Sequence, residues 1–319
     1  MRVEIWMDVV CPWAYIGKRR VERALATLAE PVEVVWRPYR IDPTAPVPAE
    51  PLADALRDPL ADDALSACAP DLSPAENRLR VDRIAAKEGL GPPWGAAWRA
   101  SSHDAHRLIA LAEEAGVQDA VVEAVLRAHF VDAVDISDRE VLAGVVGEVF
   151  PQAPALLAGD AGEERVRELL LEGKARGIRT SPTIVVGDRA LAGAQPPEVI
   201  AEFLAEGGEQ RRLPAEVERY RWAESLLEQR DPLGALVLLR PLLDEHGRDR
   251  SVRMLAARAW YASAQLERAR AALEELVAEQ PADAYANVLL GRTLQRLSRP
   301  EEAEPYLRVG GALVPAYAG

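Results

Sequence analysis

A short segment near the amino terminus constrains the fold more than any other part of the sequence. Residues Val3–Val10 form a mostly apolar run, rich in β-branched residues, that ends at Cys11. Pro12 follows, and in the segment Tyr15–Leu28 the apolar residues return at helical spacing. A proline in the first helical turn costs nothing, because its missing N–H would have no partner there. We therefore expect a strand, a sharp turn and a helix whose amino terminus carries Cys11.

The position of Cys11 also predicts reactivity. The unpaired N–H groups and the dipole of a helix amino terminus stabilise a thiolate relative to a thiol. A free cysteine has a pKa of about 8.5, and such a position lowers it. We therefore expect Cys11 to be a nucleophile at neutral pH. The alternative is a buried cysteine that fills space as a small apolar side chain.

Residues 11–20, Cys-Pro-Trp-Ala-Tyr-Ile-Gly-Lys-Arg-Arg, carry a family resemblance. With the preceding strand, they resemble the active-site opening of DsbA-like thioredoxin proteins, in the FrnE-type branch related to 2-hydroxychromene-2-carboxylate isomerases and kappa-class glutathione transferases. Residues 103–108, 130–138 and 177–195 resemble the same branch in the same order. The resemblance implies an α/β thioredoxin-like fold with an inserted helical subdomain, and the activity of a thiol–disulfide oxidoreductase.

The sequence departs from this family at one position of the motif. Oxidoreductases of the family carry Cys-x-x-Cys, whereas Ala14 stands at the second cysteine position here. Thiol–disulfide exchange proceeds through a mixed disulfide, which a second thiol must resolve. Ala14 is compatible with a natural single-cysteine enzyme that uses an external thiol, with a degenerate site, or with an engineered replacement. No cofactor is expected to be required, and a low-molecular-weight thiol is the candidate second reactant.

The resemblance implies further residues of the site. Pro182 matches the proline, cis in thioredoxin-like folds, that faces the reactive cysteine, so Pro182 is a candidate catalytic residue beside Cys11. The backbone of Ser181 would then offer strand-like hydrogen bonds to a substrate. Pro12 and Trp13, next to the cysteine, are candidate substrate-binding residues.

Two residues of a predicted helix, His106 and Arg107, are additional candidates for substrate binding. The resemblance places the helix that begins near His103 against the active site, so these side chains would line a substrate cleft. The alternative is structural, because His103 and His106 share one helix face and Arg107 can pair with Asp104. No His-Glu-x-x-His pattern, cysteine–histidine cluster or glycine-rich phosphate loop is present, so no metal site is expected.

Patterns along the chain predict the remainder of a first domain, residues 1–208. Val32–Tyr39 is expected to be a strand parallel to the first, because a helix connects the two. Cys68 lies in a Pro- and Asp-rich stretch and is interpreted as an ordinary thiol rather than a distant resolving cysteine. The other expected elements are a short helix near 52–57, a helical insertion over about 74–177, strands within 178–187 and 190–192, and a helix over 197–206.

A period of 34 residues dominates the second domain, residues 209–319. Such a period, with small residues where helices cross, is typical of tetratricopeptide repeats, and about three units would form an all-α solenoid of about six helices. We expect the repeats to bind a protein partner or to mediate self-association; the alternative is that they only stabilise the first domain. The related positions are Ala223, Ala257 and Gly291; Ala235, Ala269 and Ala303; and Leu239, Leu273 and Leu307.

Charge and cysteine content exclude some classes of function. The net charge is −13, and residues 1–208 contribute −12 of it. This acidity argues against nucleic-acid or anionic-membrane binding. The sequence shows no signal peptide and no apolar stretch of about 20 residues that could span a bilayer. Together with only two cysteines, these features predict a cytoplasmic protein.

The sequence therefore favours a thiol–disulfide oxidoreductase that acts through Cys11 on protein or small-molecule substrates. Two alternatives stay open. The first is a glutathione-like thiol-dependent isomerase or transferase, although family enzymes of that kind carry a serine where Cys11 stands. The second is a non-catalytic thioredoxin-fold adaptor whose repeats do the binding.

Overall fold

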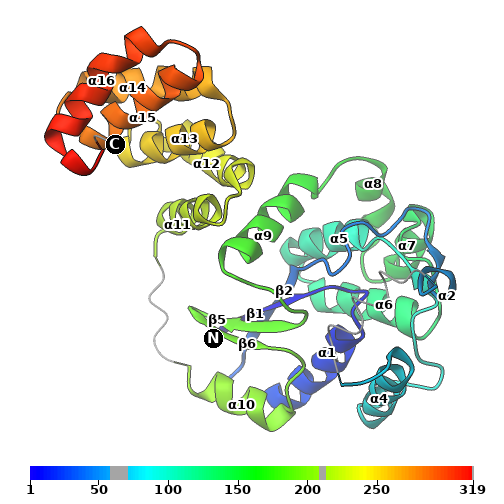
Figure 1. The fold of residues 1–319 in the computed structure, drawn as a ribbon. Helices are drawn as coiled ribbons and strands as arrows, with labels where there is room; N and C mark the ends of the chain where they lie inside the picture. Colours follow the sequence, from blue (N-terminus) through cyan, green and yellow to red (C-terminus); the bar gives the residue numbers. More distant parts are fainter. Residues whose placement is uncertain (58–70, 208–212, 318–319) are drawn as a thin grey trace. The chain divides into compact units, whose positions relative to one another are not determined.

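The computed structural model describes residues 1–57, 71–207 and 213–317 (Figure 1). Two compact units are present. The first contains the described residues up to 207 except 174–177, and the second contains those four residues and the described residues from 213 onward. The predicted boundary between residues 208 and 209, and the predicted thiol Cys68, lie outside the described residues.

The first unit is built on a four-stranded sheet with the order β2-β1-β5-β6. Strand β1 (Arg2–Met7) pairs in parallel with β2 (Glu33–Pro38), as the strand–helix–strand pattern predicted. On its other side β1 pairs antiparallel with β5 (Thr183–Val186), which pairs antiparallel with β6 (Arg189–Ala192). The mostly apolar first run thus becomes a central strand.

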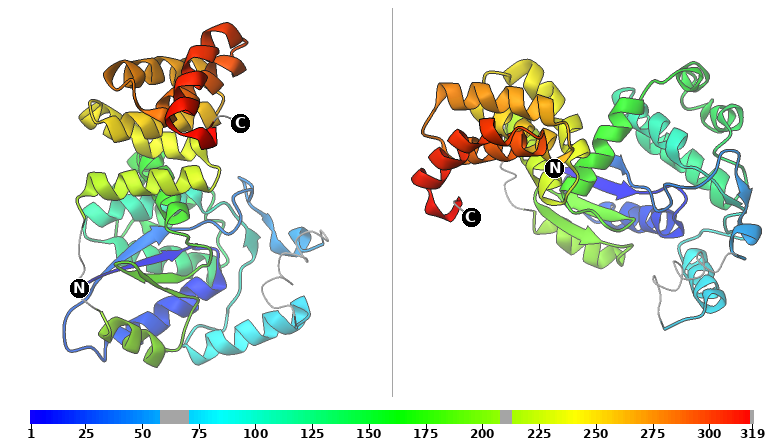
Figure 2. Two further views of the ribbon diagram at one scale, coloured as in Figure 1. Left: turned by 60° about the vertical axis from the view of Figure 1, so that its left-hand side comes forward. Right: turned by 45° about the horizontal axis from the view of Figure 1, so that its top comes forward.

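Helices cover both faces of this sheet (Figures 1 and 2). Helices α1 (Pro12–Leu25) and α10 (Pro197–Ala205) lie on one face, and α5 (His103–Glu114) and α9 (Glu163–Ala175) lie on the other. A close contact holds α9 to the sheet. A Cβ atom on Gly173 would stand 2.6 Å from the buried ring of Trp6, so this approach requires glycine.

The segment between β2 and β5 contains the predicted helical insertion. A small antiparallel pair, β3 (Glu50–Pro51) and β4 (Trp98–Arg99), was not predicted, because strands of two residues show no periodicity. The ring of Phe130 stacks on Trp94 at a centroid distance of 5.1 Å inside this region. Its helices, besides α5 and α9, are α2 (Leu52–Ala55), α4 (Pro74–Lys87), α6 (Gln118–Phe130), α7 (Arg139–Val146) and α8 (Ala153–Ala158).

The second unit is helical, as the 34-residue period predicted. Each small residue of the predicted sets lies at a helix contact: the alanines at positions 223, 257, 235, 269 and 303 are fully buried. At Gly291 a Cβ atom would stand 2.6 Å from the Leu307 side chain, so the last two helices can pack this closely only because position 291 has no side chain. The helices are α11 (Ala215–Glu228), α12 (Pro232–His246), α13 (Arg250–Ala262), α14 (Leu266–Glu279), α15 (Ala284–Arg296) and α16 (Pro300–Leu313).

The period also appears in the backbone of the turns. Arg230, Ala264 and Ser298 lie 34 residues apart, and each adopts a left-handed conformation with φ of 62°, 60° and 61°. Each follows the first helix of a pair. A left-handed residue other than glycine costs roughly 1–2 kcal/mol, so the repeat geometry imposes this backbone at all three turns.

No helix among the residues that the structure describes is both long and apolar enough to cross a membrane.

The left-handed turns predict a stabilising substitution. Ala264→Gly should raise the free energy of unfolding of the second unit by about 0.5–1 kcal/mol, because glycine adopts positive φ without the Cβ penalty but loses more backbone entropy. Urea unfolding followed by far-UV circular dichroism measures it. The control Ala272→Gly, inside α14, should lower stability by about 1 kcal/mol. Equal destabilisation by both substitutions would contradict the turn geometry.

Candidate active site

Cys11 occupies the junction between the central strand and the first helix. It is the N-cap residue of α1, with Pro12 at the first helical position, as the sequence predicted. The Cys11 N–H donates to the carbonyl of Asp8 at 3.0 Å, and the Ala14 N–H donates to the carbonyl of Cys11 at 2.9 Å. These two bonds form the sharp turn between β1 and α1.

The loop before β5 meets this thiol. The Cys11 sulfur donates to the carbonyl oxygen of Ser181 at 3.4 Å, and the peptide bond between Ser181 and Pro182 is cis. The Ser181 hydroxyl in turn accepts the N–H of Asp8 at 2.8 Å. Helix α1 approaches Pro182 so closely that a Cβ atom on Gly17 would stand 2.8 Å from the proline Cγ. Gly17 therefore sets the distance between the helix and the loop.

The pKa of Cys11 is raised to about 11, which corrects the prediction of a lowered pKa. Burial is the largest cause, because the residue is 6% exposed and its thiolate would be poorly solvated. The negative charge of Asp8 raises the pKa further. Hydrogen bonds with the Ser181 side chain and with the N–H groups of Trp13 and Ala14 lower it, so the predicted effect of the helix amino terminus is present but smaller than the cost of burial.

Asp8 is the main residue of the site that sequence reasoning missed. Its side chain is fully buried and accepts the N–H of Ile41 at 2.7 Å. Its other oxygen lies 3.3 Å from Nε2 of His106. Its charge also raises the pKa of Tyr39, although burial is the larger cause there. A signal was available, since an acidic residue ends a mostly apolar strand three residues before the cysteine.

His106 and Arg107 do not line an open cleft, contrary to prediction. Both are 1% exposed. His106 contacts the buried carboxylate of Asp8 through its Nε2 atom. The Arg107 guanidinium donates to the carbonyls of Ala161 at 2.8 Å and Gly159 at 2.6 Å, and pairs with Asp104, so the structural alternative holds for Arg107. Residues 106 and 107 face the interior because α5 turns that side toward the core.

A groove does run past the start of the same helix. Its volume is about 880 Å³, and it is lined by Arg40, Ser101, His103 and Arg139, among others. Cys11 is not one of its lining residues. The α5 side chains that line this groove are therefore His103 and Asp104, which precede the predicted residues.

The remaining predicted residues differ in accessibility. Pro12 and Trp13 are half-buried, and the Arg80 guanidinium lies 5.6 Å above the Trp13 ring. Ala14 is buried in the first turn of α1. No group of three or more histidine, cysteine or acidic side chains able to hold a metal occurs in the described part of the chain.

A second histidine near the site, His129 on α6, was not among the predicted site residues. It is buried, and burial lowers its pKa to about 4, although the charges of Asp8 and Asp135 oppose this. His129 is therefore neutral at pH 7. Its ring packs edge-on against Phe130 at a centroid distance of 4.7 Å.

A thiol at the amino terminus of a helix, opposite a cis-proline loop on a mixed sheet, defines a thioredoxin-like protein. Residues 2–205 match the model of the DSBA-like thioredoxin domain, and the chain belongs to this family. Residues 226–292 match the model of the tetratricopeptide repeat, which confirms the predicted repeats.

Solved structures show the same resemblance. A "probable DsbA oxidoreductase" from Streptomyces coelicolor is 31% identical, with 67% of this chain and 93% of that one covered and a TM-score of 0.56. Less similar are 2-hydroxychromene-2-carboxylate isomerase (18% identical, 64% and 95% covered, TM-score 0.44) and the cytosolic disulfide reductase DsbM from Pseudomonas aeruginosa (19% identical, 64% and 98% covered, TM-score 0.43). No curated protein sequence matches the chain significantly.

The Cys11 environment predicts the pH dependence of its reactivity. Alkylation of Cys11 by iodoacetamide, measured by mass spectrometry of its peptide, should be slow at pH 7 and should rise up to about pH 11. Asp8→Asn should shift this profile to lower pH, because it removes a negative charge beside the thiolate. Asp188→Asn, at an exposed hairpin, should leave the profile unchanged. A plateau already at neutral pH in the parent protein would contradict the buried site.

His129 predicts a loss of stability in mild acid. Its folded pKa of about 4 lies below the unfolded value of about 6.5, so its contribution is complete above pH 6.5 and disappears as the pH falls toward 4. The free energy of unfolding of the first unit should fall by up to about 1.4 kcal/mol per pH unit in this window. Urea unfolding followed by tryptophan fluorescence measures this, since five of the seven tryptophans precede residue 208. His129→Leu should flatten the profile, whereas His246→Gln, exposed on α12, should not.

Proposed function

We propose that the chain is a FrnE-type thiol–disulfide oxidoreductase that uses Cys11 as its single reactive thiol. The observation that carries the proposal is the position of the Cys11 sulfur, 3.4 Å from the Ser181 carbonyl and at the start of α1. A sulfur bonded to Cys11 would lie beside the same loop. The backbone of Ser181 and the side chains of Pro12 and Trp13 would then contact the substrate.

The reaction has three exchange steps. The Cys11 thiolate attacks one sulfur of a substrate disulfide, a new S–S bond forms, and the other sulfur leaves as a thiolate. A low-molecular-weight thiolate then attacks the Cys11 sulfur of the mixed disulfide, and the second substrate sulfur leaves as a thiolate. A second small thiolate attacks the small-thiol sulfur bonded to Cys11, which forms the small-molecule disulfide and releases the Cys11 thiolate. Two small thiols thus supply the two electrons that reduce the substrate disulfide. The second step is intermolecular because position 14 is alanine.

The raised pKa favours the reducing direction. A thiolate of high pKa is a strong nucleophile once formed and a poor leaving group, so its mixed disulfide is long-lived. The burial that raises the pKa also keeps most of the thiol protonated at pH 7. Substrate binding that stabilises the Cys11 thiolate would therefore increase the rate. We further propose a cytoplasmic location, where small thiols are abundant.

A second candidate function is favoured by the burial of the thiol. Cys11 is only 6% exposed, and its sulfur donates to a neighbouring carbonyl. A non-catalytic adaptor could keep such a buried cysteine because it fills space in the core. In that case, the first unit would be a scaffold and the repeats would supply binding. The two functions differ in whether Cys11 forms mixed disulfides.

Capture of a mixed disulfide tests the first function. The full chain incubated with glutathione disulfide should gain one glutathione on Cys11, detected by peptide mass spectrometry, and Cys68→Ser should behave in the same way. Cys11→Ser should abolish both this adduct and the reduction of a protein disulfide while leaving the circular dichroism spectrum unchanged. Retained reductase activity in Cys11→Ser would contradict the proposal, and absence of any adduct on Cys11 would favour the adaptor.

Restoring the second sulfur tests the role of position 14. With about 0.1 mM external thiol, Ala14→Cys should raise the reductase rate roughly tenfold, because a neighbouring thiol acts at an effective concentration of mM or more. Ala14→Ser is the matched control, since it adds a similar polar atom without a resolving thiol. Equal rates in the two variants would show that resolution does not limit turnover.

A further inference from the structure

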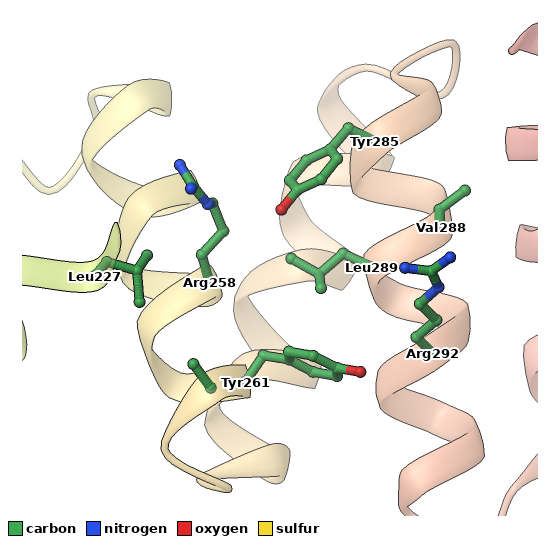
Figure 3. Close-up of a pocket in the computed structure, with 8 residues that line it drawn as sticks. Leu227, Arg258, Tyr261, Tyr285, Val288, Leu289 and Arg292 are labelled. Carbon is green, nitrogen blue, oxygen red and sulfur yellow. The ribbon is translucent and has the colours of Figure 1, made fainter. Parts of the chain in front are cut away.

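The repeats contain a pocket with a distinct chemical character (Figure 3). Its volume is about 240 Å³, and it is formed by α11, α13 and α15, the first helices of the three successive pairs. These helices line the same side of the solenoid. The lining residues are Leu227, Arg258, Tyr261, Ala262, Tyr285, Val288, Leu289 and Arg292.

The charged groups of this pocket all have one sign. Of the eight lining residues, Arg258 and Arg292 are the charged ones, and none is acidic. They lie 34 residues apart, so successive repeats present a guanidinium at the same position. Residues 209–319 as a whole carry a net charge of only −1, because residues 1–208 contribute −12 of the −13. The pocket therefore concentrates positive charge on a nearly neutral domain.

Both guanidinium groups are available to a ligand. Arg258 lies 3.8 Å from Glu224, an ion pair at the limit of contact with both side chains at least 32% exposed. Such a pair contributes about 0–1 kcal/mol and is readily exchanged for another carboxylate. Arg292 is exposed and forms no ion pair with any residue in the described ranges.

The floor of the pocket between the two arginines is apolar. In Figure 3 the Leu289 side chain lies between the rings of Tyr285 and Tyr261, with Arg258 on α13 and Arg292 on α15. Leu289 is buried, whereas Tyr285 is 40% exposed. A volume of about 240 Å³ accommodates one large side chain and part of its backbone, not a folded domain.

We propose that this pocket binds an acidic peptide segment of a partner protein, with one apolar side chain of the segment on Leu289 and flanking carboxylates paired with Arg258 and Arg292. This proposal deepens the interaction role proposed for the repeats. Charge complementarity selects the partner, because a basic segment would be repelled by both guanidinium groups. The aromatic rings add apolar contact area around the inserted side chain.

Peptide binding to the full chain tests this proposal. A fluorescein-labelled Glu-Glu-Phe-Glu-Glu peptide, followed by anisotropy, should bind and should weaken as salt is raised. The labelled Lys-Lys-Phe-Lys-Lys peptide should not bind, and Glu-Glu-Ser-Glu-Glu should bind about tenfold more weakly, because the apolar contact is lost. Binding of the basic peptide with equal or higher affinity would overturn the proposal.

Substitutions locate the binding to the pocket. The double variant Arg258→Gln with Arg292→Gln should weaken binding of the acidic peptide about 2- to 30-fold, since two exposed charge pairs are lost. Arg308→Gln on α16 is the matched control, because it removes an exposed arginine outside the pocket. Unchanged affinity in the double variant would overturn the proposal. A second result would also overturn the proposal: sedimentation shows that the parent chain forms dimers, the double variant does not, and neither binds the peptide. The pocket would then be occupied by a second copy of the chain. Cys11→Ser should bind the peptide normally, which separates this test from that of thiol exchange.

Discussion

Contact between the start of α1 and the loop before β5 is the constraint on which the first unit depends. The two segments are about 170 residues apart in the chain, yet three contacts join them: the Asp8 N–H to the Ser181 hydroxyl, the Cys11 sulfur to the Ser181 carbonyl, and Gly17 against Pro182. The inserted helices must return the chain to this point, because β5 also pairs with β1. The position of the Cys11 sulfur therefore depends on the pairing of β5 with β1.

The same contact determines the chemistry of the thiol. A helix amino terminus favours the thiolate, but the loop that faces Cys11 also removes it from water and places it near the buried charge of Asp8. The result is a pKa of about 11 rather than a lowered one. The exchange that we propose, through a slow and long-lived mixed disulfide, is consistent with this raised pKa and with the alanine at position 14. Burial, not the helix amino terminus, has the largest effect on the pKa of Cys11.

The repeats reach a regular structure by a different physical route. Their contacts are local, since each helix packs mainly on its neighbours in sequence, and small residues at the crossings allow close approach. The regularity extends to the left-handed turns at Arg230, Ala264 and Ser298 and to the paired guanidinium groups of the pocket. A repeated backbone thus presents a repeated side chain, which is how a solenoid can build a binding surface from modest sequence variation.

The sequence by itself determined the elements whose patterns are local. It predicted the strand–turn–helix that holds Cys11, the parallel pairing of the first two strands, the helical insertion and the 34-residue repeats, because periodicity and turn chemistry depend on neighbouring residues. Only the tertiary structure decided which side chains face one another. It buried His106 and Arg107, brought Asp8 beside the thiol, and raised the pKa that the helix position alone would lower. The physical reason is that burial and long-range charge depend on segments distant in the chain, and no local pattern encodes them.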